Sequence, residues 1–187
     1  MSNKIRIVAF SGSLRKASYN TAAIHTAMEI SAEQCEIELL DISDLPLYNE
    51  ELDGDNAPEQ VLQLAQKVLA ADAILFSTPE YNYSISGVLK NAIDWLSKQS
   101  PQPFAGKPAA IMSASMSFLG GARAQYHLRQ IMIYLDVHFI NKPEVMIASA
   151  HEKFDSKGHL TDDMTRDVIG QMITALTQLS DQLNTSR

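Results

Sequence analysis

Residues 5–21 read IRIVAFSGSLRKASYNT, an apolar run that passes into a serine-containing turn. The run Ile5–Phe10 is short and lacks regular hydrophobic–polar alternation, which is typical of a parallel strand buried on both faces. From Asn20 to about Ser31 the apolar residues recur at spacings of three and four, which indicates a helix. A buried strand, a tight turn and a helix in this order predict the first unit of a parallel α/β sheet.

The rest of the chain continues the alternation of strands and helices. We predict strands at Ile5–Phe10, Cys35–Ile42, Ala73–Ser77, Pro108–Ala114 and Val145–Ala148, with helices between them and a C-terminal amphipathic helix around residues 169–183. Residues 43–57 are polar and contain proline, so we expect a loop there. Five strands alternating with five helices imply a three-layer α/β sandwich with right-handed crossovers. Residues 1–187 show no repeat or linker, and we expect one domain.

Composition narrows the class of protein. The chain has 187 residues, 45% of them hydrophobic, and one cysteine, Cys35, so it is typical of a globular protein of a reducing compartment. Its apolar runs are shorter than the roughly 18 residues that span a bilayer, and the run near the N-terminus is too short for a signal peptide. We therefore expect a cytoplasmic protein without a membrane partner.

The charge is distributed unevenly along the chain. The net charge of −7 argues against nucleic-acid binding, which needs clustered Lys and Arg. Residues 1–28 nevertheless carry four Lys or Arg and no Asp or Glu, whereas all 22 acidic residues follow. This asymmetry is either a chance feature of a solvated face or a local site for a small phosphorylated ligand.

The turn after the first strand carries a donor set that suits a phosphate monoester. It supplies hydroxyls at Ser11, Ser13 and Ser18, the guanidinium of Arg15, the amide of Asn20 and the N–H groups of a starting helix. The alternative is a serine-rich loop in which Asn20 is only the N-cap. The Gly-x-x-x-x-Gly-Lys-Ser/Thr and Gly-x-Gly-x-x-Gly patterns are absent, which excludes a P-loop and a Rossmann dinucleotide site.

Two further loops follow predicted strands at the same sheet edge. Residues 78–87, TPEYNYSISG, offer tyrosine faces and backbone amides to a planar heterocycle, or alternatively form a rigid proline turn with exposed aromatics. Residues 113–121, SASMSFLGG, end in two glycines that either let a ligand approach the backbone or relax the start of a helix.

Together these loops resemble the flavodoxin-like NAD(P)H-dependent FMN reductases, in the branch that contains quinone and chromate reductases. The resemblance rests on residues 12–20 (GSLRKASYN), 78–84 (TPEYNYS) and 87–96 (GVLKNAIDWL), and extends to residues 120–123, 126–130 and 141–144. Ile85-Ser86-Gly87 departs from the pattern, because many relatives carry a proline there.

The resemblance implies a flavodoxin-like sheet of strand order 2-1-3-4-5 and a set of FMN-binding residues. The first loop would bind the FMN phosphate, the second would line the isoalloxazine ring, and the third would close the ring or ribityl side. The implied cofactor-binding residues are Ser13, Leu14, Arg15, Ser18, Tyr19, Asn20, Pro79, Glu80, Tyr81, Asn82, Tyr83 and Ser115.

The implied function is two-electron transfer from NADPH or NADH, through bound FMN, to quinones or other small acceptors such as flavins, chromate or azo compounds. We expect ping-pong kinetics, no side chain acting as an indispensable acid or base, and a homodimer, with a tetramer as the alternative. A flavodoxin-type electron carrier, or an FMN-binding partner protein, is the alternative function. A metal site is not expected, because the five histidines lack His-Glu-x-x-His spacing.

Overall fold

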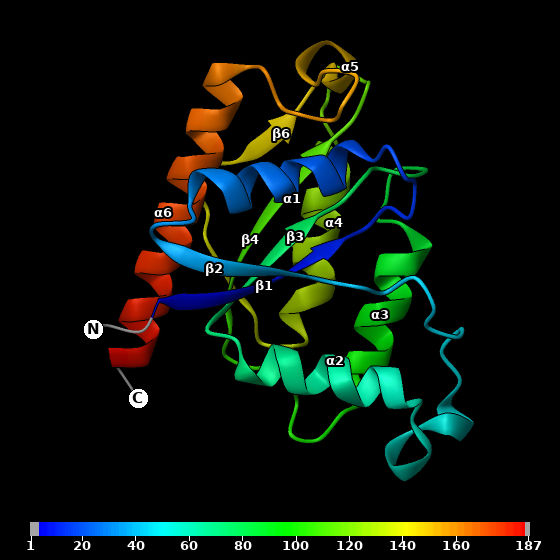
Figure 1. The fold of residues 1–187 in the computed structure, drawn as a ribbon. Helices are drawn as coiled ribbons and strands as arrows, with labels where there is room; N and C mark the ends of the chain where they lie inside the picture. Colours follow the sequence, from blue (N-terminus) through cyan, green and yellow to red (C-terminus); the bar gives the residue numbers. More distant parts are fainter. Residues whose placement is uncertain (1–3, 186–187) are drawn as a thin grey trace.

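The computed structural model describes residues 4–185 and contains a parallel sheet between two layers of helices (Figure 1). Its strands run in the order β2-β1-β3-β4-β5, with β6 also paired to β4, which confirms the predicted order. The strands are β1 (Ile5–Ser11), β2 (Cys35–Leu40), β3 (Ala73–Ser77), β4 (Pro108–Ala114), β5 (His138–Phe139) and β6 (Val145–Ile147).

The fifth position of the sheet differs from the prediction, because it is occupied by two short strands in place of one. β5 pairs with Pro108 and Ala109 at the start of β4, whereas β6 pairs with residues 112–114 at its end. Between them lies Pro143, which has no N–H to donate to a sheet ladder. The predicted strand at Val145–Ala148 is therefore only the second part of this edge.

The helices follow the predicted alternation except for the short α5, which was not predicted and which precedes α6 without a strand between them. They are α1 (Tyr19–Ile30), α2 (Glu59–Ala70), α3 (Gly87–Ser97), α4 (Ala122–Ile133), the short α5 (Ala150–Lys153) and α6 (Asp163–Thr185). The predicted loop at residues 43–57 contains two 3₁₀ turns, at Glu50–Leu52 and Gly54–Asn56. Within residues 4–185, no helix combines the length and the apolar character needed to cross a bilayer.

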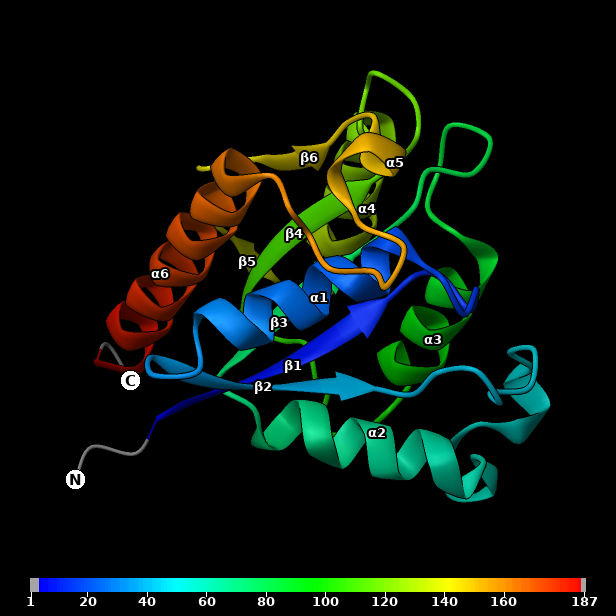
Figure 2. The same ribbon diagram turned by 45° about the horizontal axis from the view of Figure 1, so that its top comes forward.

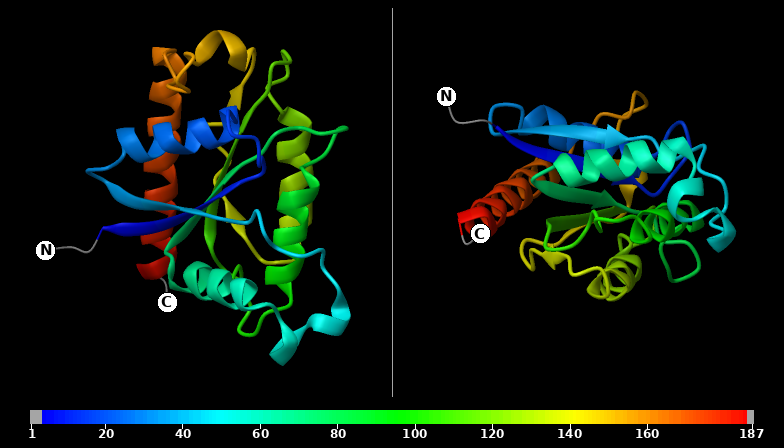
Figure 3. Two further views of the ribbon diagram at one scale, coloured as in Figure 1. Left: turned by 45° about the vertical axis from the view of Figure 1, so that its right-hand side comes forward. Right: turned by 90° about the horizontal axis from the view of Figure 1, so that it is seen from below.

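The two faces of the sheet each have a separate hydrophobic core, which explains the apolar character of the strands. In β1, Ile7 and Ala9 face α1 and α6, whereas Val8 and Phe10 face α2, α3 and α4. The views in Figure 3 show the sheet between these two helical layers. Each fully buried Ile, Val or Phe side chain contributes about 1.5–3 kcal/mol to the free energy of unfolding.

The loops after β1, β3 and β4 lie at one end of the sheet, near α5 (Figure 2). They gather there because parallel strands share one carboxyl-terminal edge, where open α/β sheets bind ligands. The orange segment that links α5 to α6 crosses beside the start of α1 in the same view. This end of the molecule carries the candidate site.

Candidate functional site

A cavity of about 330 Å³ lies between the three loops. It is lined by nine of the twelve predicted cofactor-binding residues, together with Ala114 and Met116; the nine are Ser13, Arg15, Ser18, Tyr19, Asn20, Pro79, Glu80, Tyr81 and Ser115. The other three predicted residues, Leu14, Asn82 and Tyr83, are exposed and lie outside the cavity lining. Residues that are far apart in the sequence therefore lie together in one cavity, as expected for loops that follow neighbouring parallel strands.

The start of α1 forms the polar end of this cavity. Ser18 is the N-cap, and its Oγ accepts the N–H of Thr21 at 3.2 Å, so the proton of its own hydroxyl can be donated elsewhere. The first N–H groups of a helix have no intrahelical acceptor and carry the positive end of the helix dipole. Arg15 is exposed beside them, with its guanidinium carbon 5.1 Å from the centre of the Tyr19 ring. This end attracts an anion.

Asn20 has a different role from the N-cap alternative, because its side chain is buried and bonded to the sheet. Its Nδ2 donates to the carbonyl of Ala114 at 3.0 Å, and its Oδ1 accepts from the N–H of Ala114 at 2.9 Å. The hydroxyl of Ser77 also donates to Oδ1, at 3.2 Å. The amide therefore joins the start of α1 to the ends of β3 and β4, and what Asn20 can offer a ligand comes mainly from its backbone N–H.

The loop after β3 is a tight turn with an unusual backbone. Tyr81 and Ser84 exchange both backbone hydrogen bonds, at 2.9 and 3.0 Å. The two residues between them, Asn82 and Tyr83, have φ of +51° and +69°. Positive φ at both central positions is typical of a type I′ turn, and it is costly for a tyrosine. The turn must therefore be held by contacts outside itself.

Those contacts come from α4, which the sequence did not connect with this loop. The Glu80 carboxylate, whose side chain is only 9% exposed, lies 2.5 Å from the Arg123 Nε and also accepts the Arg123 backbone N–H at 3.1 Å. The guanidinium carbon of Arg123 lies 3.7 Å from the centre of the Tyr83 ring. One turn further along α4, the His127 Nδ1 lies 2.8 Å from the Ser84 hydroxyl. Arg123 and His127 thus fix the turn from both ends.

The loop after β4 is braced by the protein itself. The Ser115 hydroxyl lies 3.1 Å from both the Oγ and the N–H of Ser117. Gly120 and Gly121 have positive φ, and a Cβ at these positions would lie within 3 Å of Met146 or Ser113. The glycines lie where α4 begins, with Gly121 as its N-cap, which fits the second explanation, and they also let the protein's own chain approach closely.

The donor set fits a phosphorylated ligand with a flat ring. One end of the cavity offers a guanidinium, serine hydroxyls and a helix N-terminus, which is the chemistry of a phosphate site. The other end offers apolar faces from Pro79, Tyr81 and Met116. Among the described residues, no cluster of three or more His, Cys, Asp or Glu side chains is placed to hold a metal ion.

Comparison with known proteins supports the same chemistry. Residues 5–152 match the family described as NADPH-dependent FMN reductase. The chain is 54% identical to an NAD(P)H-dependent FMN reductase of Pseudomonas aeruginosa, over 94% of this chain and 95% of that protein. It is 44% identical to a quinone reductase of Escherichia coli K12, with the same coverage. The structure of the flavoenzyme NAD(P)H:(acceptor) oxidoreductase FerB from Paracoccus denitrificans superposes with a TM-score of 0.87 at 34% identity, covering 95% of this chain and 98% of FerB.

Proposed function

Because this chain belongs to the NADPH-dependent FMN reductase family and is an oxidoreductase that uses FMN and NAD(P)H, we propose that it reduces quinones and other small acceptors by a ping-pong mechanism. The observation that carries the proposal is the cavity, which has an anion-binding end at α1 and an apolar end that opens to solvent beside Tyr81 and Met116. Bound FMN supplies the ability to accept a hydride from a nicotinamide and to pass two electrons on. Because this end of the cavity is open, it would admit both substrates in turn, and such shared access gives ping-pong kinetics.

The side chains of the cavity would bind the cofactor and orient it. Arg15, Ser13 and Ser18, with the N–H groups at the start of α1, would hold the FMN phosphate, and the backbone from Pro79 to Tyr83 would border the ring. Asn20 keeps the phosphate loop in register with β3 and β4. Residues that hold the cofactor in this way would position the reacting atoms for hydride transfer, which needs a separation of roughly 3–3.5 Å.

None of these side chains needs to act as an acid or base. Glu80 supplies the only carboxylate in the cavity lining, and it is occupied by Arg123. A positioned acid or base contributes about 10²–10⁴-fold to a rate. We therefore expect FMN-saturated Glu80→Gln and Tyr81→Phe proteins to be reduced by saturating NADPH within about tenfold of the wild-type rate. A loss of 10²-fold or more at full FMN occupancy, followed by stopped-flow absorbance, would contradict this mechanism.

The same experiment separates an enzyme from an electron carrier. An NAD(P)H-dependent reductase bleaches its own flavin absorbance when NADPH is added without oxygen, whereas a flavodoxin-type carrier needs a separate reductase. Subsequent addition of a quinone should restore the absorbance in a second, independent phase. Flavin that stays oxidised with both NADPH and NADH would refute the proposed function.

We further propose that the working form is a homodimer. The cavity volume is near the lower end of the roughly 300–1,000 Å³ of small-molecule sites. Beyond the opening at Tyr81 and Met116, its surroundings expose further large apolar side chains, namely Tyr83, Phe118 and Tyr126. A second copy would cover this surface and complete the wall of the site. Light scattering of the FMN-loaded protein should give twice the chain mass of 20.6 kDa, or four times for a tetramer, and a monomer at micromolar concentration would exclude this proposal.

A further inference from the structure

A second cavity, of about 550 Å³, lies next to the first on the other side of α1's first turn. One wall is the loop and helix start at residues 15–19, 21 and 22, with His25 beyond them. The opposite wall is the turn from Asp155 to His159, which links α5 to α6. The two cavities share Arg15, Ser18 and Tyr19 as lining residues, so they are neighbouring parts of one surface.

The second cavity is positively charged in a protein of net charge −7. Its lining contains the side chains of Arg15, Lys16 and Lys157, all exposed and without an ion pair among residues 4–185. His25 and His159 add two imidazoles. The concentration of cations here is a feature that the FMN site alone leaves unexplained.

The single carboxylate of this lining is already occupied. Asp155 Oδ1 accepts the backbone N–H groups of Lys157 and His159, both at 2.8 Å, and Oδ2 lies 3.1 Å from the His159 ring. These hydrogen bonds, the one from the His159 backbone above all, lower the pKa of Asp155 below its usual value. The carboxylate shapes the turn, and the lysine charges remain available to a ligand.

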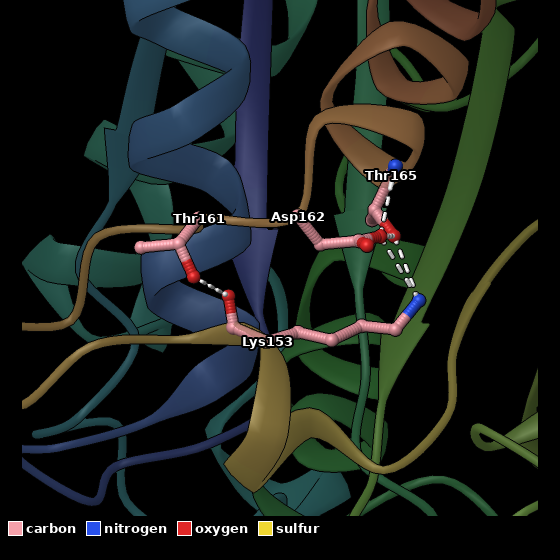
Figure 4. A network of polar contacts seen from close by, with 4 residues as sticks. All are labelled: Lys153, Thr161, Asp162 and Thr165. Atoms are coloured by element: carbon pink, nitrogen blue, oxygen red, sulfur yellow. Dashed lines mark hydrogen bonds and ion pairs between the residues drawn. The ribbon is translucent and has the colours of Figure 1, made fainter.

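The turn that forms the second wall is fixed at its base. Figure 4 shows Lys153 Nζ donating to Asp162 Oδ1 at 3.1 Å and to the Thr165 hydroxyl at 2.9 Å, while Thr165 also bonds to Asp162. The hydroxyl of Thr161 donates to the carbonyl of Lys153 at 3.1 Å. A fixed base holds the Asp155–His159 turn, and with it Lys157, in place opposite α1, so that binding costs little ordering of the loop.

We propose that the second cavity binds the adenosine end of NADPH, with Lys157 and Lys16 contacting its 2′-phosphate, so that the enzyme prefers NADPH to NADH. The inference rests on the proposed function, in which the nicotinamide stacks at the open end of the first cavity. A dinucleotide that starts there continues past Arg15 and Tyr19 into the neighbouring cavity. The volume of this cavity is that of a small-molecule site, which is more than an inorganic anion requires. A phosphate monoester is the group that distinguishes NADPH from NADH, and it requires cations.

Binding of adenosine fragments tests the proposal independently of turnover. We expect FMN-loaded protein to bind adenosine 2′,5′-bisphosphate at least fivefold more tightly than adenosine 5′-monophosphate in isothermal titration calorimetry. Lys157→Ala should lower that ratio about twofold, and Lys16→Ala/Lys157→Ala should bring it close to one, because hydrogen bonds to charged groups carry the preference. The ratio of kcat/KM for NADPH to that for NADH should fall in parallel.

Lys98→Ala is the matched control, because Lys98 is exposed at the C-terminal end of α3, outside the lining of both cavities. It should leave the affinity ratio unchanged. Equal affinities for the two nucleotides, a ratio that survives Lys157→Ala, or displacement of the bisphosphate by equimolar inorganic phosphate would overturn the proposal. Flavin that neither coenzyme reduces would instead refute the proposed function, and the calorimetric ratio would still report on the cavity.

Discussion

Replacing Arg123 with alanine should loosen the turn after β3 and lower the stability of the whole protein. The change removes a guanidinium whose Nε lies 2.5 Å from the Glu80 carboxylate, in a pair whose side chains are 35% and 9% exposed. It also removes the cation–π contact with Tyr83. Breaking a fully buried ion pair costs about 3–5 kcal/mol. Here the partial exposure of Arg123 and the retained backbone N–H to Glu80 reduce the expected loss in free energy of unfolding to about 2 kcal/mol.

The loss can be measured by thermal and urea unfolding. For a chain of this size, about 2 kcal/mol corresponds to a fall in Tm of about 4–8 °C. The double-mutant cycle with Glu80→Gln should give a coupling energy of about 1 kcal/mol or more, because the two side chains are in direct contact. Lys90→Ala is a suitable control, since Lys90 pairs with Asp94 at 2.7 Å but both side chains are well exposed, and it should cost less than about 0.5 kcal/mol.

An additive result in the double-mutant cycle would contradict the coupling of Arg123 and Glu80. If the effects of Arg123→Ala and Glu80→Gln add within about 0.3 kcal/mol, the two residues are not coupled and the turn is held by something else. FMN affinity gives a second readout, because Pro79 and Tyr81 line the cavity on either side of Glu80. Arg123→Ala should weaken FMN binding more than Lys90→Ala does.

Three further predictions concern the cofactor, the sheet and pH. Arg15→Ala should weaken FMN binding by about tenfold to a hundredfold and leave riboflavin binding nearly unchanged, as measured by fluorescence quenching, because the lost contact is with the phosphate; equal effects on both flavins would contradict this. Asn20→Ala should lower the free energy of unfolding by about 2–4 kcal/mol in urea titrations, because it leaves the N–H of Ala114 buried without its acceptor; a change below 0.5 kcal/mol would show that the amide is dispensable. The hydrogen bond to Asp53 raises the pKa of Tyr48 to about 12, so the folded state holds this proton more tightly than the unfolded state, and stability should fall as the pH rises from about 10 to about 12. Tyr48→Phe should lack this part of the decline in thermal unfolding curves, and an identical pH profile would argue against the assignment.

The alternation of strands and helices can be predicted because the burial of each element determines the pattern of apolar residues within it. Strands buried on both faces have no polar positions, and the helices that cover them repeat apolar residues every three or four. The residues at which an element begins and ends are harder to predict from these patterns. Asn20 and Ser18 are both good N-cap residues, and only the packing of Asn20 against Ala114 decides that Ser18 takes the cap. Likewise, β5 has two residues, too few to produce a period.

Residues of the site could be predicted where they follow a strand, and could not be predicted where they depend on contacts between distant elements. Nine predicted residues line the cavity because they follow strands, and the ends of parallel strands must meet. Arg123 was missed because its partner Glu80 is 43 residues away and on another element. The only local sign is that Arg123 and His127 are four residues apart, which places them on one face of α4. Nothing in that spacing identifies the loop that this face contacts.

The divided fifth strand has a consequence for self-association. An open sheet has two outer strands, and an uninterrupted outer strand invites a strand of another molecule to pair with it, which leads to aggregation. On one side of this sheet β2 presents the exposed carboxylates of Glu36 and Glu38. On the other side the interruption at Pro143 leaves segments of two and three residues, which are too short to pair with a strand of another molecule. Both borders therefore resist strand addition, and copies of this chain are left to meet through helices and loops, which preserves the sheet at high protein concentration.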